Sequence, residues 1–135
     1  MGGRAECCAD TGAPTPIRAS RNLSIDILLQ ARGGHPVPIQ MDHGIDTDVE
    51  KLFQKISAEQ SGKLDILVNN AYAGVNTIFT STGKKFYETD PTETWDCING
   101  VGLRGHYHCT VLASRIMVPR KQGLIVNVSS SGGMR

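Results

Sequence analysis

The sequence is poor in the features that identify several common classes of protein. It has one tryptophan, three tyrosines and three phenylalanines, and lysine and arginine are scattered along a chain whose formal net charge is +1. Nucleic-acid-binding proteins rely on basic surfaces and aromatic stacking residues, so we expect no nucleic-acid partner. No apolar run approaches the roughly 18 residues that a transmembrane helix needs, and the N-terminal region lacks a signal-peptide core. We therefore expect no transmembrane segment and a location in the cytoplasm or at the periphery of an intracellular membrane.

The four cysteines are poorly placed for a disulfide framework. Cys7 and Cys8 are adjacent, and Cys97 and Cys109 share one predicted helix. Twelve helical residues span about 18 Å, which is far beyond the reach of a disulfide. We expect reduced thiols, as is usual inside cells.

The sequence also gives little support to a metal site. His106 and His108 are two residues apart, so on a helix their side chains point about 200° apart and cannot bind one ion together. His106 and Cys109 share a helix face, but no second pair completes a tetrahedral site. We predict structural roles for these residues and no bound metal.

Hydrophobic periodicity and turn residues divide the chain into an irregular leader and a regular remainder. Residues 1–19 show neither a helical nor a strand period of hydrophobic residues, and they are rich in glycine, alanine and proline. From residue 20 onward, helical and strand patterns alternate. The predicted elements are a helix over 20–32 that stops at Gly33-Gly34, a strand over 37–42, a helix from a Thr47/Glu50 capping box to Ser61-Gly62, a strand over 64–68, a helix over 91–118 capped by Asp90, and a strand over 124–128.

This alternation predicts an α/β protein with a doubly wound parallel sheet. The segment 64–68 is apolar throughout, as expected of a parallel strand that helices cover on both faces. Pro38 lacks a backbone donor, so the strand over 37–42 is predicted at an edge of the sheet. We expect residues 20–135 to form one domain that follows the leader 1–19.

Two adjacent asparagines, Asn69 and Asn70, follow the apolar strand 64–68, although asparagine is a poor strand residue. Ligands in open parallel sheets bind beyond the carboxyl ends of the strands, so these side chains are candidates for contacting a ligand. The alternative is an ordinary turn in which the asparagines hydrogen-bond their own backbone.

Three segments, in this order, carry a resemblance to a known family. Their sequences are SGKLDILVNNAYAG, WDCINGVGLRGHYHC and QGLIVNVSSSGG. Together they resemble the short-chain dehydrogenase/reductase family, over roughly Leu23 to Arg135. The resemblance implies a Rossmann-type sheet, NAD or NADP as cofactor, and hydride transfer between nicotinamide and a small-molecule carbonyl or alcohol substrate.

The resemblance also implies roles for single residues. In the family, an acidic residue contacts the adenine and an Asn-Asn-Ala motif shapes the floor of the cofactor site. The matching cofactor-binding positions in this chain are Asp42, Asn69, Asn70, Ala71 and Gly74. Gly74 is included because Tyr72 stands where the family more often has glycine. The alternative for Asp42 is a solvated turn residue.

Ser130 matches the family's catalytic serine by its place in the pattern strand-Ser-Ser-x-x-Gly. Its hydroxyl would hydrogen-bond the substrate oxygen and stabilise charge that develops there. Ser129 and Ser131 are close competitors. The alternative is a polar loop after a strand, in which serine and glycine are ordinary residues.

Several features of the family are not recognisable in this sequence. Val101-Gly102 stands where the family usually has a helix asparagine, Thr11-Gly12-Ala13 does not continue into a glycine-rich phosphate loop, and no tyrosine is followed four residues later by lysine. In the family's strand order 3-2-1-4-5, two strands that we do not identify separate the strand near 37–41 from that at 64–68. We expect a partial Rossmann-type sheet that lacks the first strands and the C-terminal part, with an open edge along 64–68.

Two functional hypotheses remain open. In the first, the chain is a fragment or variant of an NAD(P)-dependent oxidoreductase and has no turnover as it stands, because the Tyr-x-x-x-Lys acid/base motif is missing. In the second, it is a non-catalytic binding or dimerising module derived from that family. The helix over 91–118 carries Gly100, Gly102 and Gly105, and close packing in a homodimer would offset the cost of glycine in a helix.

Overall fold

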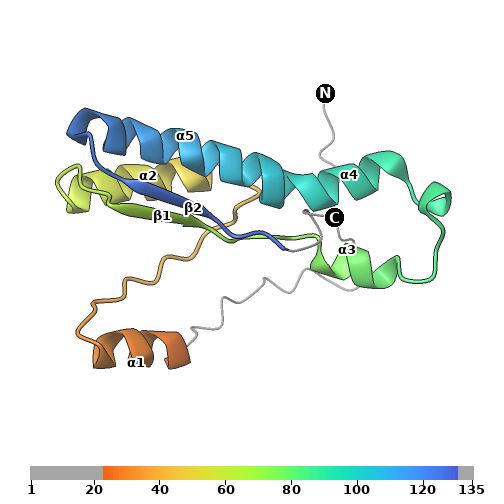
Figure 1. Cartoon of the computed structure of the whole chain (residues 1–135), viewed down its shortest axis with the longest axis horizontal. Coiled ribbons are helices and arrows are strands. Elements are labelled where there is room, and N and C mark those ends of the chain that lie inside the picture. The colour runs from red at the N-terminus through yellow and green to blue at the C-terminus, as the bar shows by residue number, and fades with distance from the viewer. Residues whose placement is uncertain (1–22, 131–135) are drawn as a thin grey trace. The chain divides into compact units, whose positions relative to one another are not determined.

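A computed structural model describes residues 23–130 of the chain (Figure 1). The described residues belong to two compact units, of which one ends at Met41 and the other begins at Asp42. Three predictions lie outside the described residues. They concern the irregular leader over 1–19, the segment Thr11-Gly12-Ala13 and the helix start at residue 20.

The unit that ends at Met41 contains helix α1 (Leu23–Ala31) and an extended segment that follows it. The N–H groups of Gly33 and Gly34 donate to carbonyl oxygens of the last helical turn, both at 2.9 Å. Gly33 has a φ of +79°, a conformation that glycine adopts without steric cost. The predicted glycine stop of this helix is confirmed.

The strand predicted over 37–42 is wrong. Within the described residues this segment pairs with no strand and has no regular structure. Pro36 and Pro38 supply no backbone donors for a sheet ladder. The apolar residues that suggested a strand therefore lie on an extended, unpaired chain.

The unit that begins at Asp42 alternates helices and strands (Figure 1). Its elements are α2 (Asp46–Glu59), β1 (Ile66–Asn69), α3 (Val75–Thr80), α4 (Pro91–Asn99), α5 (His106–Met117) and β2 (Leu124–Asn127), with short 3₁₀ turns at Phe86–Glu88 and Val118–Arg120. A π-helical segment, Gly100–Gly105, joins α4 to α5. These three segments form one continuous helical rod, which we predicted as a single helix without the π-helical turn.

The cap predicted for α4 is confirmed. The carboxylate of Asp90 accepts the backbone N–H groups of Thr92 and Glu93 at 2.9 and 2.8 Å, and Pro91 occupies the first helical position. These are the residue types that satisfy a helix start.

The capping box predicted for α2 from Thr47 and Glu50 is wrong. The helix begins at Asp46, one residue before Thr47, and the residue that precedes it, Ile45, makes no side-chain cap. Acidic residues in the first turn stabilise the start of the helix instead, because the positive end of the helix dipole favours negative charge. The predicted end of α2 is confirmed by Gly62, whose φ is +69°.

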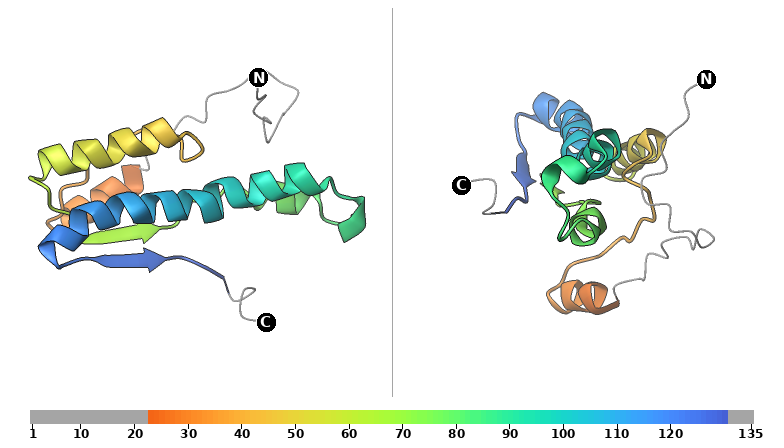
Figure 2. Two further views of the ribbon diagram at one scale, coloured as in Figure 1. Left: turned by 90° about the horizontal axis from the view of Figure 1, so that it is seen from above. Right: turned by 90° about the vertical axis from the view of Figure 1, so that its right-hand side faces the viewer.

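The sheet of the described residues has two parallel strands. β1 lies beside β2 in the register Ile66↔Leu124 through Asn69↔Asn127. The chain between the two strands forms α3 and then the helical rod. α5 packs against β1, and α2 packs against α5 (Figure 2). This arrangement confirms the predicted α/β fold with a partial Rossmann-type sheet.

The core lies where α2, the rod and β1 meet. Its buried apolar side chains are Val49, Phe53, Cys97, Cys109, Ala113 and Met117. The opposite face of the sheet is bare in the described residues, because Ile66 and Val68 are 57% and 55% exposed. The prediction that helices cover both faces of this strand therefore holds for one face. No helix among residues 23–130 combines the length and the hydrophobicity needed to cross a membrane.

Candidate functional site

The side chain of Asn69 joins three elements at the carboxyl end of β1. It is 3% exposed. Its amide nitrogen donates to Asn127 Oδ1 at 2.8 Å and to Thr110 Oγ1 at 3.0 Å, and lies 3.5 Å from the carbonyl oxygen of His106. Because the nitrogen carries two N–H groups, the two shorter bonds satisfy it. Asn69 thus connects β1 to β2 and α5, and its side chain bonds across elements and not within a turn.

The role of Asn127 was not predicted, although the sequence contains a signal for it. β1 reads ILVN and β2 reads LIVN, and the parallel register places the two asparagines opposite each other. Parallel neighbours with the same pattern end at the same edge of a sheet. A polar residue at the same position of both strands therefore indicates a shared site.

The helical rod also holds the backbone that follows Asn69. Nε2 of His106 lies 2.8 Å from the carbonyl oxygen of Ala71. His106 and Thr110 are four residues apart and share one helix face, so Thr110 contacts the strand end and His106 contacts the chain two residues later. This contact is a structural role for His106, as the sequence predicted.

The ring of Tyr72 extends the contact along the same helix face. A Cβ atom at Gly102 would lie 2.9 Å from Cδ2 of this ring, so the ring packs directly on the helix backbone. Gly102 precedes His106 by four residues. The segment Asn69–Tyr72 therefore runs along one face of the rod, from α5 into the π-helical segment.

The predicted floor residues differ in exposure. Asn70 is exposed, Ala71 is half-buried, and Gly74 is buried at the start of α3. The rod holds the segment from one side, and the side chain of Asn70 is open to solvent at the carboxyl end of β1. This is the edge at which open parallel sheets bind ligands.

Asp42 belongs to the turn that leads into α2. It is exposed, its carboxylate accepts the N–H of Gly44 at 2.7 Å, and its own N–H lies 3.5 Å from Oδ2 of Asp48. Among the described residues no hydrogen bond joins Asp42 to Asn69 or to Ala71. Its observed contacts are those of a turn residue.

Ser130 lies three residues beyond the end of β2 and is exposed. The chain that leads to it begins beside the end of β1, because the N–H of Val128 donates to the carbonyl oxygen of Asn69 at 2.9 Å. Ser129 is also exposed, and Ser131 lies outside the described residues. The structure therefore places the serine segment at the same sheet edge as Asn70.

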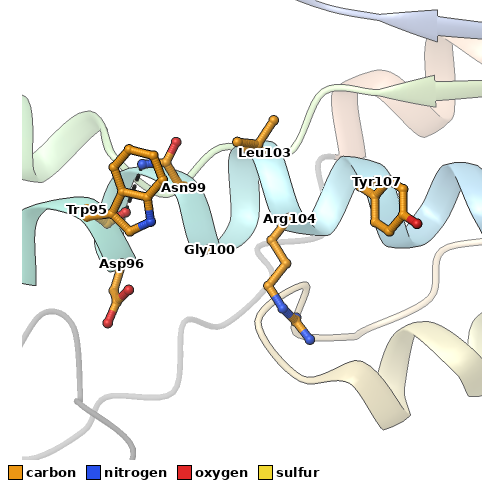
Figure 3. Close-up of a pocket in the computed structure, with 7 residues that line it drawn as sticks. All are labelled: Trp95, Asp96, Asn99, Gly100, Leu103, Arg104 and Tyr107. Carbon is orange, nitrogen blue, oxygen red and sulfur yellow. Dashed lines mark hydrogen bonds between the residues drawn. The ribbon is translucent and has the colours of Figure 1, made fainter. Parts of the chain in front are cut away.

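The outer face of the rod carries a hollow of about 420 Å³. Its lining residues are Trp95, Asp96, Asn99, Gly100, Leu103, Arg104 and Tyr107 (Figure 3). Asn99 donates its side-chain N–H to the carbonyl oxygen of Trp95 at 3.0 Å, as a helix-surface asparagine does. Short π-helical segments often occur at functional sites, and here the segment Gly100–Gly105 forms part of the hollow.

Arg104 links this part of the rod to α2. Its guanidinium donates two hydrogen bonds to the carboxylate of Asp46, both at 2.7 Å. The hydrogen bond and the charge of Asp46 raise the pKa of Arg104 above its ordinary value. The pair stabilises the start of α2 against the π-helical segment, although exposed pairs of this kind contribute only about 1 kcal/mol or less.

Two buried cysteines, Cys97 and Cys109, belong to the core. Sγ of Cys97 lies 2.8 Å from Oγ1 of Thr77. The expectation of reduced thiols stays a prediction, and Cys7 and Cys8 lie outside the described residues. Burial raises the pKa of the Cys109 thiol. Within the part of the chain that the structure describes, no three histidine, cysteine or acidic side chains gather as a metal site.

Comparison with known proteins shows close sequence relatives. The family model of short chain dehydrogenases matches residues 12–135, so the similarity begins before Leu23, where the sequence alone had suggested its start. The human protein named dehydrogenase/reductase SDR family member 1 is 52% identical over 106 residues, which cover 78% of this chain and 34% of the human protein. A 3-oxoacyl-(acyl-carrier-protein) reductase of Synechocystis is 28% identical over 77% of this chain and 38% of that protein.

Solved structures show the same fold. A short-chain alcohol dehydrogenase of Sinorhizobium meliloti is 28% identical, with a TM-score of 0.65 over 81% of this chain and 40% of that chain. A metagenomic short-chain oxidoreductase in complex with NADP is 23% identical, with a TM-score of 0.65 over 80% of this chain and 45% of its own. The chain spans about a third of the length of the curated relatives it matches.

Proposed function

Because the chain belongs to the short-chain dehydrogenase family, we propose that it supplies the floor of the cofactor site in an NAD(P)-dependent oxidoreductase. The observation that carries the proposal is the buried side chain of Asn69, which bonds to β2 and α5. It holds the following residues at the carboxyl ends of two parallel strands, where a dinucleotide binds in sheets of this kind.

The residues present fit such a cofactor. Asn70, Ala71 and Gly74 would form the floor beneath it, and Asp42 would contact the adenine. Bound NAD(P) would supply or accept a hydride. The hydroxyl of Ser130 would donate a hydrogen bond to the oxygen of a carbonyl or alcohol substrate, because Ser130 follows β2 at the same sheet edge.

We propose further that these 135 residues have no turnover by themselves. None of the three tyrosines is followed four residues later by lysine, so the chain lacks the pair that would transfer the proton at neutral pH. In the longer proteins that resemble this chain, proton transfer would come from residues outside the matched part.

Dinucleotide titration tests the cofactor floor. We expect NADH or NADPH fluorescence to change saturably with the chain, and the dissociation constant to rise about fivefold in Asn70→Ala, equivalent to about 1 kcal/mol. The matched control is Asn76→Ala, because Asn76 is also exposed but lies on α3. Absence of saturable binding to both dinucleotides would exclude the proposal, and equal effects of the two variants would remove Asn70 from the floor.

A second candidate function is homodimerisation through the rod over residues 91–118. Trp95, Leu103 and Tyr107 are 63%, 63% and 71% exposed along one hollow of its outer face, and apolar side chains gathered in this way mark interaction sites. We expect sedimentation to show a dimer that Leu103→Glu weakens. Phe86→Glu is the control, because Phe86 is 94% exposed and does not line the hollow. A chain that stays monomeric at all concentrations would contradict this function.

We also propose a cytoplasmic location. Cys109 is a buried thiol outside any disulfide, as is common in the reducing cytosol. Cell fractionation tests it, and recovery of the chain from a secretory compartment would contradict it.

A further inference from the structure

Two glycines stand at positions where the backbone conformation does not require glycine. Gly74 has φ −73° and ψ 0°, and Gly102 lies inside the π-helical segment; neither has a positive φ. Glycine is unfavourable in a helix because of its conformational freedom. Glycine also lacks a side chain, and this second property matters where another group fills the space.

Tyr72 occupies the space that both glycines leave. A Cβ atom at Gly102 would lie 2.9 Å from Cδ2 and 3.2 Å from Cε2 of the ring. A Cβ atom at Gly74 would lie 2.5 Å from the hydroxyl oxygen and 2.7 Å from Cζ. The ring of Tyr72 therefore packs against the backbone at both glycines, although 43% of the residue stays exposed, and a side chain at either position would displace the ring.

The packing of this ring continues the contact that His106 makes. Nε2 of His106 lies 2.8 Å from the carbonyl oxygen of Ala71, and Ala71 precedes Tyr72. Two successive residues are thus fixed to positions 102 and 106 of the rod, one by a hydrogen bond and the other by packing. Both contacts lie on the side of the segment that faces the rod.

We propose that Tyr72 is a positioning residue for the dinucleotide: its ring, held between Gly74 and Gly102, sets the backbone of Ala71–Gly74. The inference rests on the proposed cofactor floor. One contact also accounts for two departures from the family pattern. Tyr72 stands where the family more often has glycine, and its ring occupies the space that a side chain at position 102 would need.

Two readouts on the whole 135-residue chain test the inference. The first is the dissociation constant for NADH and NADPH. The second is hydrogen exchange of the backbone amides of residues 72–75, with the amides of α2 as an internal reference. The variants are Tyr72→Ala and Tyr72→Phe, and the control is Tyr87→Ala, because Tyr87 is 75% exposed and belongs to a separate 3₁₀ turn.

We expect Tyr72→Ala to raise the dissociation constant about fivefold or more and to accelerate exchange at 72–75 while α2 exchanges as before. Tyr72→Phe keeps the ring, so its dissociation constant and its exchange rates at 72–75 should stay within about twofold of those of the unmodified chain. Tyr87→Ala should change neither. Unchanged binding in Tyr72→Ala, or equal weakening in Tyr87→Ala, overturns the inference.

A double-mutant cycle keeps the test decisive if Tyr72→Ala unfolds the chain. Gly102→Ala inserts a methyl group against the ring and should accelerate exchange at 72–75. The same change should have a smaller effect in a Tyr72→Leu background, where the ring is absent. Equal effects in both backgrounds overturn the inference.

The failure of the proposed function would be recognised separately. If the unmodified chain binds neither dinucleotide, the cofactor floor is excluded. In that case, unchanged exchange at 72–75 in the Tyr72 or Gly102 variants also overturns the positioning role. Accelerated exchange in the variants would show that Tyr72 holds this segment in the unmodified chain. Without dinucleotide binding, however, the segment would position no cofactor, so the inference would fail with the function.

Discussion

The two strands of the sheet end in the same way in sequence but not in structure. Both end with asparagine, and the register sets Asn69 opposite Asn127. Asn69 is buried and bonds to β2 and α5, whereas Asn127 is exposed and so is Ser130 beyond it. The difference arises because α5 packs on β1. A strand pattern therefore identifies the sheet edge, but the helix above it decides which end becomes a rigid part of the site.

The largest expected effect that tests this comparison is at Asn69. Asn69→Leu removes the hydrogen bonds that the buried amide donates to Thr110 and Asn127. At about 1 kcal/mol for each bond, the expected loss is about 2 kcal/mol of unfolding free energy. Asn127→Leu should cost less, because Asn69 keeps its bond to Thr110. Urea unfolding of both variants measures the difference. Equal destabilisation would mean that the two strand ends are held alike.

A smaller effect is expected at His106, which holds the chain just beyond Asn69. His106→Leu keeps the size of the side chain but removes the bond to the Ala71 carbonyl oxygen, at a cost of about 1 kcal/mol. Unfolding by urea measures it, with Tyr107→Leu as the control on the exposed face of the same helix. A control that destabilises the chain as much would show that the hydrogen bond does not hold the segment.

The packing of α5 can be tested through pH. Burial raises the pKa of the Cys109 thiol above its ordinary value of 9.0, so the folded state favours the neutral thiol. The stability that this provides is fully present below pH 9.0 and is lost as the pH rises through the higher folded pKa. We expect unfolding free energy to fall over this range, and to fall less in Cys109→Ala. Identical pH dependence in both proteins would mean that the thiol is solvated.

The smallest effect is expected in the exposed segment that follows β2. Ser130 is exposed beyond β2, so Ser130→Ala should change the free energy of unfolding by less than about 0.5 kcal/mol. Differential scanning calorimetry against the unmodified chain measures it. A loss of stability comparable to that of His106→Leu would show that the segment after β2 is also held.

Prediction from sequence succeeded where local patterns are sufficient and failed where they are not. The cap at Asp90, the glycine stop after α1 and the strands near 64–68 and 124–128 follow from local residue types, and the structure confirms them. The strand over 37–42 was wrong because an extended pattern forms a strand only where a partner exists. The capping box at Thr47 was wrong because the helix starts one residue earlier.

The candidate site shows the same limit. The sequence pointed to Asn69 and Asn70, because polar residues after an apolar parallel strand indicate a ligand edge. Ala71 and Gly74 were added by the resemblance to the family. Thr110, Asn127 and the packing of Tyr72 on Gly102 were not predicted as parts of that site. No local period connects residues that lie 41 and 58 positions apart.

The sequence by itself determined that this is an α/β chain, because helix periods, caps and apolar strands are properties of neighbouring residues. Its resemblance to the short-chain dehydrogenase family rested on three motifs, and comparison with known proteins confirms it. The tertiary structure alone decided which asparagine is buried, what His106 binds and why Gly102 has no side chain. Those outcomes depend on which face of the helical rod meets β1, and that face is selected by packing between distant segments.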